Sequence, residues 1–193
     1  MTGFTGRKTR LRAEKPGKPP VLAVRPAPGA GRPSRGILQA GPHRIPCALG
    51  RGGVTAFKRE GDGGTPIARM RLLSAFRRRG RLPGLAVSLP VRWVDPARDG
   101  WCDAPDHPAY NRPVRLPFAA SHETLARADC LYDFGLVLDW NVSARARLRG
   151  SAIFLHVAKA GYRPTEGCVA LHPRDLLRIA PFLRPGAALI VSR

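Results

Sequence analysis

The sequence predicts a mainly β domain, and three observations lead to that prediction. The chain has 193 residues, of which 44% are apolar, so it can form one domain with a sizeable core. Its 20 prolines and 21 glycines favour many turns and short strands over long helices. Short apolar runs recur between these turn residues, which is typical of a β-sandwich or barrel.

The N-terminal part combines a basic tail with the first strands. Residues 1–19 are basic, contain Pro and Gly and show no apolar period, which predicts a disordered tail and a domain at 20–193. Residues 26–33 are rich in turn formers and connect the first two strands. Strands are expected at 21–24, 36–40 and 44–49, followed by a tight turn at 50–53.

A glycine-rich segment comes next. Three glycines between residues 61 and 64 precede Thr65-Pro66 and require special backbone conformations. A phosphate-binding loop is the alternative, but the Walker pattern is absent. We therefore expect a tight loop that braces the sheet. The predicted elements after it are a strand at 67–73 and a variable basic segment at 74–92.

The segment from 93 to 117 gathers acidic residues, a histidine and a cysteine. The possible metal ligands are Asp99, Cys102, Asp103, Asp106 and His107. Carboxylates and imidazole can hold a cation, but this spacing matches no calcium loop. We interpret the aspartates as turn caps and expect no metal. Trp101 and Tyr110 are expected to attach the loop to the core.

The C-terminal part should contain the remaining elements. Ser121 resembles an N-cap, which predicts a short helix at 124–128, and we interpret His122 as structural. A strand at 132–140 should pair as a hairpin with a strand that ends at His156. Pro173 after His172 is typical of the first position of a helix, and apolar residues follow it at helical spacing. The last strand is expected at 187–191.

The thiol of Cys168 and the imidazole of His156 are the candidate catalytic groups. The apolar run 152–155 ends at His156, and a second run, 169–171, follows Cys168. If the intervening loop folds back, the two residues become neighbours, and His156 can take the thiol proton and lower the thiol pKa. A buried, inert cysteine and a structural histidine are the ordinary alternative. A zinc site that adds His172 lacks a fourth ligand.

The residues around Cys168 resemble the catalytic motif of the YkuD-type L,D-transpeptidase family. His156 is followed, after a loop, by Thr165-Glu166-Gly167-Cys168, where the family pattern reads Ser/Thr-His-Gly-Cys. The sequence departs from the family at Glu166, where a second histidine is usual, and at Leu171, near where many members carry arginine. The resemblance implies a β-sandwich or open barrel with one or two short helices.

The resemblance also implies roles for individual residues. Cys168 would be the nucleophile, His156 the proton donor and acceptor, and Gly167 part of the oxyanion site. The expected substrate contacts are Thr165, Glu166, Tyr110, Asn111 and Arg112. The expected supporting residues are Lys58, Glu60 and Thr65. No cofactor and no metal are expected.

The implied function is transfer of a peptidoglycan stem peptide. Cys168 would attack the stem tetrapeptide, release the terminal D-alanine and pass the acyl group from a thioester to an amine. One alternative is an L,D-carboxypeptidase, in which water takes the place of the amine. Another is a basic binding protein for nucleic acid or wall polymer, in which Cys168 is inert.

The charge and hydropathy of the chain limit its partners. A net charge of +20 raises nucleic acid as a partner, but the charges are scattered and no recognition helix is evident, so no specific nucleic acid is expected. No stretch is long and apolar enough for a membrane span, and no signal peptide is recognisable. A monomer is expected. The resemblance implies that it works in the periplasm or facing the cell wall, by an export route that the sequence does not indicate.

Overall fold

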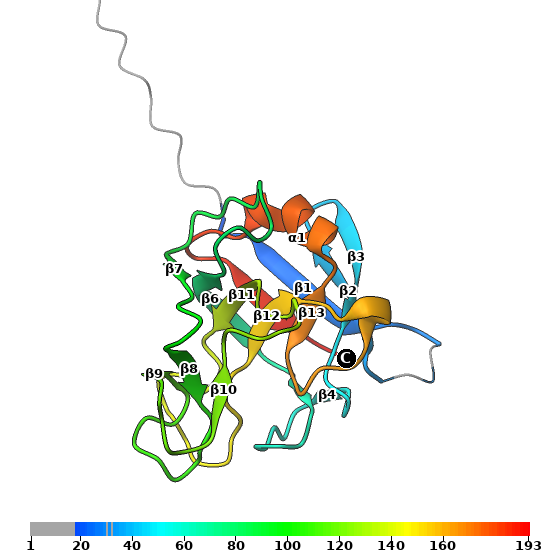
Figure 1. The fold of residues 1–193 in the computed structure, drawn as a ribbon. Helices are drawn as coiled ribbons and strands as arrows, with labels where there is room; N and C mark the ends of the chain where they lie inside the picture. The colour runs from blue at the N-terminus through cyan, green and yellow to red at the C-terminus, as the bar shows by residue number, and fades with distance from the viewer. Residues whose placement is uncertain (1–17, 30, 32) are drawn as a thin grey trace, which may run out of the picture.

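The structure is a computed structural model that describes residues 18–29, 31 and 33–193. Of the tail predicted at 1–19, residues 1–17 lie outside this range. The described chain is mainly β, as predicted, with one α-helix, α1 (Pro173–Ile179), above the sheet in Figure 1. None of the helices in the described chain is long and apolar enough to cross a membrane.

The strands are short and follow one another closely along the chain, as the turn-rich sequence predicts. Two 3₁₀ turns, Ala160–Tyr162 and Ala180–Phe182, complete the regular structure. The strands are β1 (Val21–Pro26), β2 (Arg35–Ala40), β3 (His43–Ala48), β4 (Val54–Thr55), β5 (Thr65–Pro66), β6 (Arg69–Arg77), β7 (Val91–Trp93), β8 (Asp99–Cys102), β9 (Arg112–Arg115), β10 (His122–Thr124), β11 (Phe134–Leu138), β12 (Phe154–Val157), β13 (Val169–Leu171) and β14 (Ala188–Val191).

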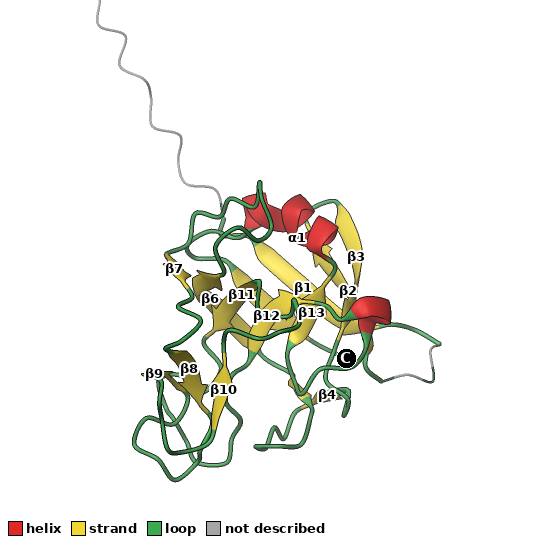
Figure 2. Ribbon diagram, viewed as in Figure 1, coloured by secondary structure: helices red, strands yellow, loops and turns green. Residues whose placement is uncertain are grey.

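The main sheet closes on itself. Its order is β11-β12-β13-β3-β2-β1-β14-β6-β7, and β6 also pairs with β11, which joins the two sides into a barrel (Figure 2). Closure leaves few unpaired strand edges. The strands β8, β9 and β10 form a separate small sheet, and β4 pairs with β5. The small sheet lies to one side of the barrel in both ribbon views.

The core forms because apolar residues alternate along the strands and cover one face of α1. In β1, Leu22 and Val24 are buried between more exposed neighbours, which is the period of a strand with one face on a core. On α1, Leu176 and Ile179 are fully buried, three residues apart. The helix predicted after His172 is therefore confirmed, and His172 itself is its N-cap.

The helix predicted at 124–128 is wrong. Residues 125–128 form bends and irregular backbone, and residues 122–124 form β10, which pairs antiparallel with β8, so that His122 lies opposite Cys102. Short helices are marginal by themselves because nucleation is unfavourable, whereas the edge of β8 offers a ready partner. The segment predicted as a variable excursion at 74–92 also begins and ends in strands, since β6 continues to Arg77 and β7 starts at Val91.

Candidate active site

Cys168 lies immediately before β13 and has a buried side chain. Its thiol donates to the carbonyl oxygen of Ala152 at 3.2 Å, and its sulfur accepts the N–H of Phe154 at 3.3 Å. Burial raises the pKa of the Cys168 thiol to about 12, because the thiolate loses solvation in this position. The resting side chain is therefore a neutral thiol at pH 7.

His156 is buried in β12 and is held in one tautomer. Its Nδ1 lies 2.8 Å from the carbonyl oxygen of Val157. Because a carbonyl only accepts, Nδ1 carries the proton and Nε2 is left as a proton acceptor. Burial lowers the pKa of His156 to about 4, so the imidazole is neutral at pH 7. The ring of Tyr132 packs edge-on against it, with centroids 5.4 Å apart.

The two candidate residues occupy neighbouring strands, as predicted. The strands β12 and β13 pair in parallel, with Leu155 opposite Val169 and His156 opposite Ala170. No hydrogen bond joins the sulfur of Cys168 to the imidazole in the described structure. The expectation that His156 lowers the thiol pKa is wrong for this resting state, because burial dominates and the thiol donates to a backbone carbonyl instead.

Thr165 closes the turn that carries Cys168. Its hydroxyl donates to the carbonyl oxygen of Cys168 at 2.7 Å and accepts the N–H of Gly167 at 3.2 Å. The backbone of Thr165 is also hydrogen-bonded to the residues that follow β3. Its N–H donates to the carbonyl oxygen of Leu49 at 3.0 Å, and its carbonyl oxygen accepts the N–H of Arg51 at 2.8 Å. The turn is thus anchored to the barrel on both sides.

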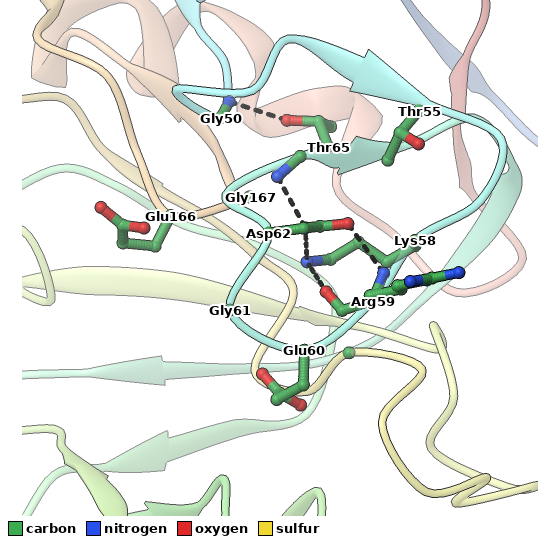
Figure 3. A network of polar contacts seen from close by, with 12 residues as sticks. Gly50, Thr55, Lys58, Arg59, Glu60, Gly61, Asp62, Thr65, Glu166 and Gly167 are labelled. Atoms are coloured by element: carbon green, nitrogen blue, oxygen red, sulfur yellow. Dashed lines mark hydrogen bonds and ion pairs between the residues drawn. The ribbon is translucent and has the colours of Figure 1, made fainter.

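Gly167 adopts a conformation that a side chain would not tolerate. Its φ is +130°, and a Cβ at this position would lie 2.8 Å from the carbonyl oxygen of Gly64. The glycine-rich loop therefore packs directly on the turn that carries Cys168 (Figure 3). Asp62 holds this loop by accepting from the N–H of Gly64 at 2.8 Å and from the ammonium of Lys58. These contacts hold the loop against the turn that carries Cys168, and the bracing of the sheet stays a prediction.

Cys168 and His156 line the same cavity, which has a volume of about 330 Å³. Its wall also includes Tyr132, Ala152 and Thr165. The two strand ends and the loop between them thus present a thiol and a neutral imidazole to the same cavity. Such an arrangement can attack a carbonyl compound that enters the cavity.

Charged side chains of both signs surround this cavity. Glu166 forms an exposed ion pair with Arg51, whose Nε lies 2.7 Å from its carboxylate. Lys159 and Arg163 line the cavity and form no ion pair within the described residues. On the acidic side, burial raises the pKa of the Glu123 carboxyl, although Arg127 lies nearby. The cavity therefore suits a ligand that carries charged groups.

Three of the predicted substrate contacts lie outside the wall of the cavity. Tyr110 is buried and its hydroxyl donates to Glu60, which does line the cavity. Asn111 is also buried and makes three side-chain hydrogen bonds within the protein. Arg112 is exposed on β9. Thr165 and Glu166, in contrast, are both part of the wall, and the direct substrate roles of all five stay predictions.

Several wall residues were not predicted from the sequence. Arg163 directly precedes Pro164-Thr165, so its closeness to the motif was a usable signal. Glu123 and Tyr132 lie far from Cys168 in sequence and reach the cavity only through the pairing of β10 with β8 and of β11 with β12. Within the described residues, no three His, Cys, Asp or Glu side chains lie close enough to hold a metal ion.

Comparisons with known proteins place the chain in a family. A family model described as YkuD, the L,D-transpeptidase catalytic domain, matches residues 39–191. Among solved structures, an L,D-transpeptidase from Mycobacterium smegmatis is 12% identical with a TM-score of 0.43, and the match covers 92% of this chain and 60% of that one. L,D-transpeptidase 1 of Mycobacterium tuberculosis is 13% identical with a TM-score of 0.37, over 89% and 62%. No curated protein matches the sequence.

Proposed function

The chain belongs to the YkuD family of L,D-transpeptidase catalytic domains, and we propose that it transfers the acyl group of a peptidoglycan stem peptide through a thioester on Cys168. The observation that carries this proposal is the placement of Cys168 and a neutral His156 in the wall of one cavity, at the ends of paired strands. The chain spans about 60% of the length of the solved structures that it matches, so its substrates are proposed here from family membership and the site.

Acylation begins when the thiol leaves the carbonyl oxygen of Ala152 and gives its proton to Nε2 of His156. The sulfur attacks the carbonyl carbon of the third stem residue, and the carbon–nitrogen bond to the terminal D-alanine breaks. The imidazolium returns the proton to the leaving amine, which completes the thioester. The bond from Nδ1 to the carbonyl of Val157 keeps the ring in the tautomer that this proton transfer needs.

The negative charge that develops on the attacked carbonyl needs backbone donors. We assign this task to the N–H groups of Gly167 and Cys168. The N–H of Gly167 donates to Thr165 at 3.2 Å, at the long end of the range for such bonds, so it can turn to an incoming oxyanion. The φ of +130° at Gly167 gives the turn its shape.

Transfer repeats these proton movements with a new nucleophile. An acceptor amine loses a proton to His156 and attacks the thioester, the carbon–sulfur bond breaks, and the sulfur takes the proton back. Lys159 and Arg163 have no ion-pair partner in the described chain and offer sites for stem carboxylates. Expulsion of D-alanine and capture by an amine together make a crosslink, and we propose on that basis that the protein works at the cell wall, in the periplasm.

Hydrolysis of the thioester by water is the second candidate function. The observation that favours it is Glu166, which stands where most family members have a second histidine and which is turned toward Arg51 rather than toward a base. The same Cys168 and His156 would then act as an L,D-carboxypeptidase. A non-catalytic basic binding protein remains the third reading, based on the net charge of +20.

The three candidates separate in one experiment. The protein is incubated with purified disaccharide-tetrapeptides, and the products and the protein are analysed by mass spectrometry. A crosslinked dimer with loss of D-alanine is the expected result, and a tripeptide alone would indicate hydrolysis. The Cys168→Ser variant should be inactive but folded, because a hydroxyl has a far higher pKa than a thiol. Products from that variant, or none from the wild type, would contradict the proposal.

A further inference from the structure

Ala152 connects Cys168 to a distant part of the chain. Its carbonyl oxygen accepts the thiol of Cys168, and its N–H donates to Oδ1 of Asn111 at 3.0 Å. Ala152 also has a φ of +51°, in the left-handed region that residues other than glycine rarely adopt. This conformation costs free energy unless surrounding contacts hold it. The bond that the N–H of Ala152 donates to Asn111 is one such contact.

Asn111 is itself rigidly held. Its side chain is 1% exposed, its Oδ1 also accepts Nε1 of Trp101 at 3.0 Å, and its Nδ2 donates to the carbonyl of Trp140 at 3.0 Å. Its backbone N–H donates to Cys102 at 2.9 Å. The amide is therefore fixed from three directions and cannot turn to follow Ala152. It acts as a fixed anchor for that residue.

We propose that Asn111 is a positioning residue that sets the resting orientation of the Cys168 thiol through the backbone of Ala152. Asn111 does not line the cavity, so its effect reaches the sulfur only through that backbone. A carbonyl that accepts from the thiol stabilises the protonated form. The thiol must leave this carbonyl before it can give its proton to His156, and Asn111 therefore helps to determine how readily the nucleophile is activated.

Asn111→Gly tests the proposal without adding backbone strain. Asn111 has a φ of +55°, which glycine adopts freely, so the substitution removes the side chain alone. The readout is the S–H stretching band of Cys168, obtained by infrared spectroscopy as the difference between each protein and its Cys168→Ala version. A thiol that donates to a carbonyl absorbs at lower frequency than a free one. The band should shift to higher frequency in Asn111→Gly.

Asn141→Gly is the matched control. Asn141 has a φ of +52° and also uses its side chain for three hydrogen bonds, but these close its own loop, to Ala146 and Gly150. Its substitution should leave the Cys168 band in place. Asn111→Asp keeps an oxygen that can accept from Ala152 but loses the donation to the carbonyl of Trp140, so its band should lie closer to the wild-type position than the band of Asn111→Gly.

The same proteins give a second measurement that needs no substrate. With Cys130→Ser as background, the alkylation rate of Cys168 at pH 8 should rise at least about threefold in Asn111→Gly and stay unchanged in Asn141→Gly, since the protonated thiol has lost its acceptor. An unshifted band in Asn111→Gly, or equal shifts in both glycine variants, would overturn the proposal. If Asn111→Gly does not fold, Asn111→Ser, whose shorter side chain takes the acceptor away from the N–H of Ala152, must shift the band in the same direction.

The inference rests on the geometry around the thiol and extends the proposed function. Because neither measurement uses a stem peptide, a failed crosslinking assay and a failed positioning role give separate results. Crosslinking with an unmoved S–H band would leave the proposed function intact and remove Asn111 from it. A shifted band without crosslinking would keep the positioning role and remove the proposed reaction.

Discussion

Nδ1 of His156 donates to the carbonyl oxygen of Val157, the next residue of β12, at 2.8 Å. An imidazole anchored in this way cannot rotate freely, and its burial makes the protonated form costly. The imidazole of His156, the proposed base, is therefore neutral at physiological pH.

The free energy of unfolding should fall by about 3 kcal/mol as the pH drops from about 6.5 to about 4, through His156 alone. The folded pKa of His156 is lowered to about 4, whereas the unfolded chain takes up the proton near the ordinary value of 6.5. In this window the unfolded state binds more protons, so acid favours unfolding. Urea unfolding at several pH values measures the effect. The difference in the free energy of unfolding between wild type and His156→Gln, followed against pH, isolates the contribution of His156. If the two proteins show the same dependence on pH, His156 is not buried as described.

Gly167→Ala should lower the free energy of unfolding by about 1–3 kcal/mol and nearly abolish acylation. Its φ is +130°, and the added Cβ would lie 2.8 Å from the carbonyl oxygen of Gly64. Gly161→Ala is the control, because its φ is +68° and a Cβ there meets nothing within 4 Å. The control should cost about 1 kcal/mol and leave acylation unchanged. Thermal unfolding measures the stability of the two variants, and mass spectrometry of the acyl-enzyme measures their acylation. Equal effects of the two substitutions would refute the close packing of Gly167 on Gly64.

Thr165→Val should lower the free energy of unfolding by about 1–2 kcal/mol and slow acylation. Valine keeps the shape of the side chain but leaves the carbonyl of Cys168 and the N–H of Gly167 without the bonds of 2.7 and 3.2 Å. Thr55→Val is a matched control, because Thr55 accepts one bond, from the N–H of Phe57 at 3.1 Å, away from the cavity. Thr55→Val should lower the free energy of unfolding by less than Thr165→Val and leave the rate of acylation unchanged. Slow acylation in both variants would indicate a general loss of stability instead.

Iodoacetamide at pH 7 should label Cys130 well before Cys168. Cys130 is exposed, whereas Cys47, Cys102 and Cys168 are buried. Burial raises the thiol pKa of both Cys47 and Cys168 to about 12, so few thiolates exist at either site. Peptide mapping by mass spectrometry follows all four cysteines in one sample. Preferential labelling of Cys168 would show that an ionised thiol–imidazole pair exists in solution without substrate.

The sequence by itself determined the class of the fold and the identity of the candidate nucleophile. Alternating apolar residues and frequent turn formers are local signals, so strands such as β1, β2 and β14 and the helix after His172 could be predicted. The motif from His156 to Cys168 is also local, because its residues lie within one short stretch of the sequence. The helix predicted at 124–128 shows the limit of such signals, since Thr124 instead belongs to β10, which pairs with β8 from another part of the sequence.

Only the tertiary structure decided how the thiol is held. The sulfur's acceptor, Ala152, and the amide that anchors it, Asn111, come from different loops, 41 residues apart in sequence. The raised pKa of Cys168 depends on burial, which is a property of the whole barrel and of no short motif. Sequence patterns report which side chains are present and their local geometry. Desolvation and long-range hydrogen bonds arise only when distant segments pack together, and these two effects set the protonation of the site.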